Sequence, residues 1–242
     1  MAPNLVLLHG FTNTGASWDQ VVAALPERYR PLAPDIRGHG RASGTQPVSL
    51  DAVVADVRAA APEPFELVGY SMGGRLALHV ALALPDRVQR LVLIGASPGI
   101  ADPDARSQRR EADERLAGEV EQMTIEAFAG RWAQTGVLAD QPPVVRAAVH
   151  ADRLRNTPAG LAAALRGLGT GALPSLWERL GELTMPVELV VGERDEKFRG
   201  IAAEMVAALP GGRVHLVDGA GHAAHLEAPG AVAALISADT RR

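Results

Sequence analysis

The sequence contains no cysteine, and this absence excludes several kinds of chemistry at once. Disulfide bonds, thiolate metal sites and thiol nucleophiles all require cysteine. Covalent catalysis would therefore have to use an oxygen nucleophile. We also expect no metal and no other cofactor.

Strong charge of one sign and long hydrophobic runs are also lacking. The net charge is -4, whereas a nucleic-acid-binding protein needs a basic face to neutralise phosphates. No apolar run reaches the roughly 18 residues of a membrane span, and residues 1–5 lack the charged start of a signal peptide. We expect a cytoplasmic protein with no nucleic-acid or membrane partner, either a monomer or a homodimer.

Short apolar runs alternate with helix-period stretches along most of the 242 residues, a length that suits one α/β core. Six runs are typical of buried parallel strands, at residues 5–8, 32–36, 65–70, 88–94, 187–191 and 214–217. Helices are predicted at residues 18–25, 50–60, 71–84, 201–209 and 229–237. This alternation predicts an α/β fold with a mostly parallel sheet and helices on both faces.

The alternation stops between residues 98 and 183, where no strand-like run occurs. This segment is charged and helical, most clearly over residues 105–123 and 159–166. We predict a core of residues 1–97 and 184–242, with residues 98–183 inserted as a helical cap. Open α/β sheets bind ligands at the carboxyl ends of their strands, so an insertion there would act as a lid.

The motif Gly69-Tyr70-Ser71-Met72-Gly73 lies between a predicted strand and a predicted helix. This is the context of the G-x-S-x-G nucleophile elbow, in which the turn is too tight for side chains on either side of the serine. The helix N-terminus would place backbone amides beside the serine, where they favour negative charge. We therefore predict that Ser71 is the catalytic nucleophile.

A serine hydroxyl needs a histidine base and a carboxylate that orients it, and in this fold they follow the serine in the order acid, then histidine. Asp195 and His222 each come shortly after a predicted strand and complete the predicted triad. Glu193 is the alternative acid, but it is adjacent to its strand and is expected to point away. His225 is the alternative base, or else a structural residue of the pocket wall.

Two backbone amides would form the oxyanion hole of such a site. One belongs to Met72, directly after the nucleophile, and the other to Phe11 in the turn after the first strand. Without Ser71, that turn would indicate no more than an ordinary loop.

Arg75 lies one helical turn after Ser71, on a helix that is otherwise apolar. A guanidinium in that position is costly unless an anion meets it. The sequence leaves two explanations open, a salt bridge to an acidic lid residue or a bound carboxylate. The lid is rich in arginine, and inward-pointing members would favour a polyanionic ligand. Trp132 and Trp177 fit the core of the lid better than a ligand platform.

Several motifs together resemble the 2-succinyl-6-hydroxy-2,4-cyclohexadiene-1-carboxylate synthase (MenH) family of the α/β-hydrolase superfamily. They are GYSMGGR at residues 69–75, GERDEKF around the sole lysine at 192–198, GHAAHLE at 221–227, LRNTPAGLA at 154–162 and GTG at 169–171. The resemblance implies a lyase of menaquinone biosynthesis, in which a Ser-His-Asp triad eliminates pyruvate from 2-succinyl-5-enolpyruvyl-6-hydroxy-3-cyclohexene-1-carboxylate.

The same resemblance implies roles for individual residues in binding a small polycarboxylate. These residues are Tyr70, Arg75, Arg155, Arg109 and Trp132. Arg110 is an equal alternative for Arg109. The chain departs from the pattern of this family in two places. Relatives place serine one residue earlier after Gly-His-Gly than this chain does at Ser43. The chain also begins too near its first predicted strand for the two antiparallel strands that often precede it in this fold.

Two other functions compete with the synthase. A carboxylesterase or carbon–carbon bond hydrolase would use the same triad, because one fold hosts many functions. An esterase for neutral esters would not need a cation at Arg75. A catalytically idle binding module is the second competitor, but such modules typically lose a triad residue.

Overall fold

A computed structural model of the chain describes residues 3–136 and 141–238. One parallel sheet forms its centre, with the strand order β2-β1-β3-β4-β5-β6. Its strands are β1 (Asn4–Leu8), β2 (Arg30–Leu32), β3 (Phe65–Tyr70), β4 (Val88–Ile94), β5 (Val187–Gly192) and β6 (Gly212–Val217). The predicted α/β fold with a parallel sheet is confirmed.

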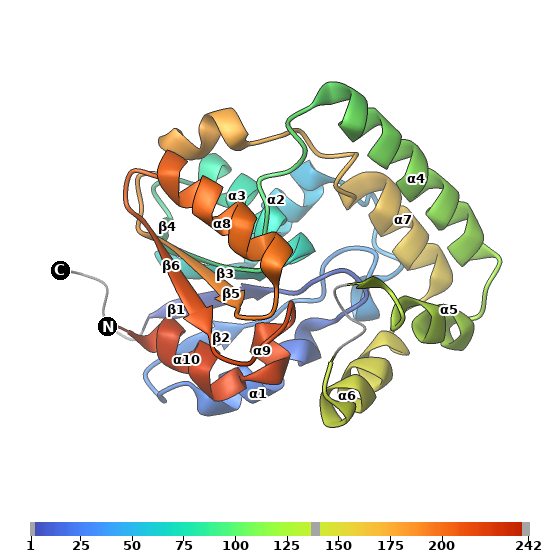
Figure 1. Cartoon of the computed structure of the whole chain (residues 1–242), viewed down its shortest axis with the longest axis horizontal. Helices are drawn as coiled ribbons and strands as arrows, with labels where there is room; N and C mark the ends of the chain where they lie inside the picture. The colour runs from blue at the N-terminus through green and yellow to red at the C-terminus, as the bar shows by residue number, and fades with distance from the viewer. Residues whose placement is uncertain (1–2, 137–140, 239–242) are drawn as a thin grey trace.

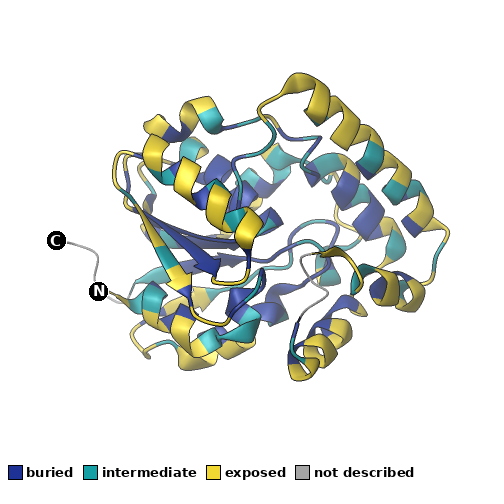
Figure 2. Ribbon diagram, viewed as in Figure 1, coloured by how far each residue is buried: buried dark blue, intermediate teal, exposed yellow. Residues whose placement is uncertain are grey.

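Helices cover both faces of the sheet (Figure 1). On one face lie α1 (Asp19–Ala24), α9 (Ala224–Glu227) and α10 (Pro229–Ser237); on the other lie α2 (Leu50–Ala60), α3 (Met72–Ala83) and α8 (Glu196–Ala208). Side chains of β1 alternate between the two layers. Leu5 and Leu7 pack in the cluster with α1 and α10, whereas Val6 and Leu8 pack with α2 and α3. The central strands β1, β3, β4 and β5 are therefore buried on both sides, whereas the edge strands β2 and β6 are partly exposed (Figure 2).

Residues 98–183, which we call the insertion, contain only helices in their described part. These are α4 (Pro103–Glu121), α5 (Ile125–Trp132), α6 (Pro143–Arg153), α7 (Pro158–Leu168) and the 3₁₀ helix η4 (Trp177–Glu182). Phe128, Leu161 and Leu165 are in a small core of their own, and the helices α4 to α7 lie to one side of the sheet (Figure 1). In neither part of the molecule does a described helix combine the length and apolarity needed to cross a membrane.

Two predicted boundaries were wrong by more than two residues. The second strand ends at Leu32 instead of residue 36, because Pro34 cannot donate to a ladder and the Asp35 carboxylate instead accepts hydrogen bonds from the backbone of Gly15 and Arg41. The helix expected from residue 201 begins at Glu196. Its N-cap is Asp195, whose Oδ1 accepts from the backbone N–H of Phe198 at 3.3 Å, an interaction that apolar periodicity does not reveal.

Candidate active site

Ser71 lies on a sharp turn between β3 and α3 and has a φ of 50°, which is rare for a residue other than glycine. The turn needs glycine on both sides. A Cβ on Gly69 would lie 2.4 Å from the carbonyl oxygen of Gly73, and one on Gly73 would lie 2.2 Å from that of Leu8. The close packing of β1, β3 and α3 therefore holds the serine at the N-terminus of α3.

Ser71, His222 and Asp195 form a continuous chain of polar contacts. His222 Nδ1 lies 2.6 Å from Asp195 Oδ2, and His222 Nε2 lies 3.2 Å from Ser71 Oγ. Since an ionised carboxylate only accepts hydrogen bonds, Nδ1 carries the hydrogen and Nε2 is left to accept from the hydroxyl of Ser71. His222 and Asp195 are both buried. The arrangement can take a proton from Ser71 and stabilise the resulting imidazolium.

Neighbouring groups fix the orientation of the His222 ring. The Phe198 ring lies against it with centroids 4.5 Å apart, and the Tyr70 ring lies at 5.3 Å. Gly95 leaves room for it, because a Cβ there would lie 3.0 Å from the His222 ring. The imidazole is therefore held between the end of β4 and the start of α8.

The two alternative triad residues lie elsewhere. Glu193 Oε2 accepts from the backbone N–H of Gly219 at 2.8 Å, which directs that carboxylate away from His222. His225 is fully buried against the rings of Trp18 and Tyr70, and neither ring nitrogen has a hydrogen-bond partner among the described residues. Burial, and then the charges of His222 and His9, lower the pKa of His225 to about 3. The geometry thus favours Asp195 and His222.

The predicted oxyanion-hole donors belong to two segments that pack against each other. Phe11 lies in the turn after β1, and a Cβ on the preceding Gly10 would lie 2.6 Å from the Tyr70 ring. Met72 is the first residue of α3. Within the described part of the chain, the backbone N–H groups of Phe11 and Met72 donate to no other group. Both are therefore available to an oxyanion.

Arg75 is 8% exposed, and its side chain makes no hydrogen bond or ion pair with any described residue. Burial, and then the nearby charge of Arg109, lower its pKa to about 10, and the charge of Asp113 opposes this shift. Asp113 accepts a hydrogen bond from Arg109 Nε at 2.8 Å instead. The salt bridge to an acidic lid residue, one of the two explanations for Arg75, is thus not formed. A buried guanidinium without a carboxylate favours an anionic ligand.

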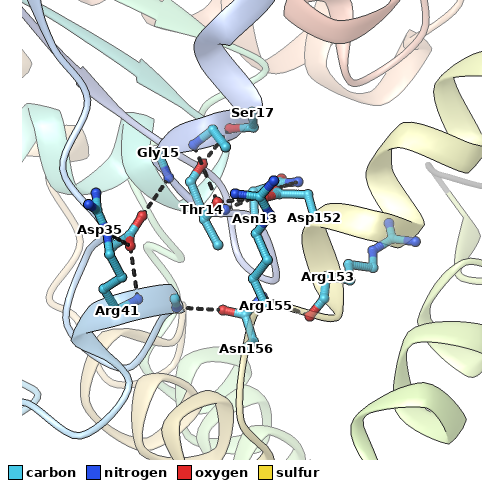
Figure 3. A network of polar contacts seen from close by, with 12 residues as sticks. Asn13, Thr14, Gly15, Ser17, Asp35, Arg41, Asp152, Arg153, Arg155 and Asn156 are labelled. Atoms are coloured by element: carbon cyan, nitrogen blue, oxygen red, sulfur yellow. Dashed lines mark hydrogen bonds and ion pairs between the residues drawn. The ribbon is translucent and has the colours of Figure 1, made fainter.

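The structure does not bring Arg155 to the site. Its side chain is 62% exposed and has one ion pair, to Asp152 at 3.8 Å. Arg153 follows Asp152 at the end of α6 (Figure 3) and is instead only 3% exposed. Its Nε donates to Thr12 Oγ1 at 3.3 Å. It lies close enough to Tyr70 to lower a phenol pKa that burial raises. Helical periodicity could have found Arg153, because it shares the buried face of α6 with Val145 and Val149.

The family of the chain follows from its similarity to known proteins. A model described as the alpha/beta hydrolase family matches residues 5–235. The 2-succinyl-6-hydroxy-2,4-cyclohexadiene-1-carboxylate synthase of Enterobacter sp. (strain 638) is 35% identical over 239 residues, covering 97% of this chain and 90% of that protein. The chain belongs to this synthase family of α/β hydrolases. The resemblance noted in the motifs is confirmed.

Other members and structures agree with this assignment. A Bacillus subtilis protein that carries the synthase name provisionally is 38% identical over 93% of this chain and 85% of its own length. The structure of MenH from S. aureus has a TM-score of 0.90 and 30% identity, covering 98% of this chain and 92% of that one. An enol-lactonase from Burkholderia xenovorans LB400, with a TM-score of 0.79 and 22% identity, shows the shared fold alone.

The remaining residues expected from the synthase family lie around the elbow with different exposure. Tyr70 is buried, and Trp132 packs on Phe11 with ring centroids 5.2 Å apart, between the turn after β1 and the core of the insertion. The side chain of Arg109 is 46% exposed, yet its charge reaches Arg75. Arg110 is exposed and has no polar side-chain contact with the described residues. Of the two alternatives, Arg109 is therefore the one that the structure brings to the site.

Proposed function

We propose that this chain is a cytoplasmic lyase of menaquinone biosynthesis that releases pyruvate from 2-succinyl-5-enolpyruvyl-6-hydroxy-3-cyclohexene-1-carboxylate. The observation that carries the proposal is a hydrogen-bonded serine, histidine and aspartate beside Arg75, a buried cation without a carboxylate partner. The synthase name of its relatives supports the same reaction.

The two compound names specify which bonds change. The precursor has one ring double bond, from C3 to C4, and the product has two, from C2 to C3 and from C4 to C5. The C2–H bond and the C5–O bond must therefore break. The C2 hydrogen is acidic because C2 is attached to the succinyl ketone. In our proposal His222 takes the proton of Ser71, and Ser71 Oγ takes the C2 proton.

The electron pair from the C2–H bond moves first onto the ketone oxygen, forming an enolate. It then returns through the ring to form the two double bonds, and the C5–O bond breaks. The leaving group is the enolate of pyruvate, which the imidazolium of His222 can protonate. No covalent intermediate is needed. The backbone N–H groups of Phe11 and Met72 would stabilise the ring enolate at the moment its charge develops.

The charge of the substrate matches the buried arginines. The precursor carries carboxylates on the ring, on the succinyl chain and on the enolpyruvyl group. Arg75 and Arg153 are both buried and neither has an acidic partner within salt-bridge distance among the described residues. Because guanidinium groups bind carboxylates through two parallel hydrogen bonds, we assign both to substrate binding, with Tyr70, Arg109 and Trp132 beside them.

The test is to incubate the purified chain with the precursor and to measure released pyruvate with lactate dehydrogenase. A panel of neutral esters, such as p-nitrophenyl acetate, is assayed in parallel. We expect pyruvate release that depends on Ser71. Ester cleavage without pyruvate release would contradict the synthase function and favour the alternative function of a carboxylesterase.

A further inference from the structure

Thr12 has a backbone conformation that its side chain disfavours. Its φ is 69°, in the left-handed region, where a β-branched residue is an outlier. The residue is buried and lies in the turn that carries Phe11, closed by a hydrogen bond from Asn13 N to Gly10 O at 3.1 Å. Such conformations persist only where the surrounding structure holds them, and they are frequent at active sites.

The insertion supplies the groups that hold Thr12. Asn156 Nδ2 donates to the carbonyl oxygen of Thr12 at 2.9 Å, and Arg153 Nε donates to the hydroxyl of Thr12 at 3.3 Å. Asn156 Oδ1 also accepts from the backbone N–H of Gly40 at 3.0 Å. All of these donors and acceptors are buried except Gly40. Asn156 thus joins the insertion to two loops of the core.

Asp152 holds the next two residues of the same turn. Its Oδ2 accepts from the backbone N–H of Thr14 at 2.9 Å and from Asn13 Nδ2 at 3.4 Å, and its Oδ1 accepts from the hydroxyl of Thr14 at 2.5 Å. Residues 152–156 lie at the end of α6, just before α7 begins at Pro158, and we call them the corner. The corner contacts the turn through the backbone or side chain of Thr12, Asn13 and Thr14.

We propose that Asp152 and Asn156 are positioning residues for the oxyanion hole. They hold the turn of residues 10–14 in the strained conformation that directs the Phe11 N–H at the developing oxyanion. The insertion would then complete the catalytic site as well as cover it. This inference rests on the proposed use of the Phe11 N–H.

The proposal predicts a distinctive kinetic defect. The oxyanion exists only along the reaction path, so a misplaced donor lowers kcat and leaves KM almost unchanged. Ester hydrolysis also passes through an oxyanion, so it should be impaired as well. Loss of a substrate carboxylate clamp such as Arg75 would instead impair only the synthase reaction.

The first experiment compares Asn156→Ala and Asp152→Asn with the wild-type chain on both substrates. We expect kcat to fall by about 10- to 100-fold for the precursor and for p-nitrophenyl acetate, with KM within about twofold, since direct loss of an oxyanion donor costs about 100- to 1,000-fold. Leu154→Ala is the matched control. Leu154 lies at the same corner and is 37% exposed, and its side chain has no polar group that could hold the turn. Its kcat should stay at the wild-type value.

A rescue experiment separates positioning from a general loss of structure. Glycine adopts positive φ without the steric cost of threonine, so Thr12→Gly should restore the turn in the Asn156→Ala background. We expect the double variant to recover at least about fivefold in kcat on p-nitrophenyl acetate, which needs no arginine clamp. The thermal unfolding midpoint, measured on every variant, shows which of them are folded.

Unchanged kcat in folded Asn156→Ala and Asp152→Asn, a defect confined to KM, or no rescue by Thr12→Gly would overturn the proposal. Failure of the proposed function is separate. A wild-type chain that cleaves the ester but releases no pyruvate would remove the synthase assignment, and the same kcat losses on the ester would still support the positioning role.

Discussion

The carboxyl edge of the sheet and the insertion place their functional residues in different ways. Ser71, Asp195 and His222 each follow their own strand, so a local turn sets each position. Arg153 and Asn156 reach the site only because α6 packs against the turn after β1. In our proposal the sheet edge carries the proton transfers, whereas the insertion adds residues that bind the substrate and support the oxyanion hole.

Removal of the nucleophile should have the largest effect and should affect both reactions. Ser71→Ala leaves no group for His222 to activate, so kcat for pyruvate release and for ester cleavage should each fall by about 1,000-fold or more. Steady-state assays on both substrates measure this loss. If either activity survived, the sheet edge would not be the shared catalytic centre.

Replacement of the buried cation should separate the two reactions. Arg75→Met removes the proposed carboxylate clamp, so kcat/KM for the precursor should fall by about 100-fold, with the neutral ester within about threefold. The same change removes a buried charge without a partner, so the thermal midpoint of the empty protein should rise. Arg166→Gln is the control, because Arg166 is paired with Glu114 and Glu121 on the outside of the insertion. Equal losses on both substrates would contradict the clamp.

Two arginines of the insertion test whether burial identifies the binding residue. Arg153→Met should raise KM for the precursor by about tenfold, because a buried guanidinium near Tyr70 is lost. Arg155→Met should change KM by less than about twofold, because its side chain is largely exposed. Initial rates over a range of precursor concentrations measure both. A larger effect at Arg155 would show that the insertion closes differently over the substrate.

These arginines also show how far the sequence could predict the structure. The bounds of α2 and α10 match their predictions, because Ser49 and Pro229 mark the helix starts locally. The triad candidates followed from strand ends in the same way. The resemblance suggested Arg155, two residues from the buried Arg153, because exposure depends on how α6 packs. The strained conformation of Thr12 has no local signature either, since its partners lie more than 100 residues away.

Acid should destabilise the core through its buried histidines. Burial lowers the pKa of His225 and of His39 to about 3 and that of His79 to about 4. The unfolded chain binds protons near its ordinary pKa of about 6.5, whereas the folded chain does not, so stability is present above that pH and is lost as the pH falls toward 3. Each fully buried histidine should lower the free energy of unfolding by about 2 kcal/mol at about pH 5.

The variant His225→Phe tests this expectation. It keeps an aromatic ring against Trp18 and Tyr70 but binds no proton at this position in the unfolded chain. We measure the free energy of unfolding with urea at about pH 7.5 and at about pH 5. Its decrease between the two pH values should be about 2 kcal/mol smaller for the variant than for the wild type. An equal decrease in both proteins would mean that His225 is protonated in the folded protein, and that water reaches the sheet edge in spite of its close packing.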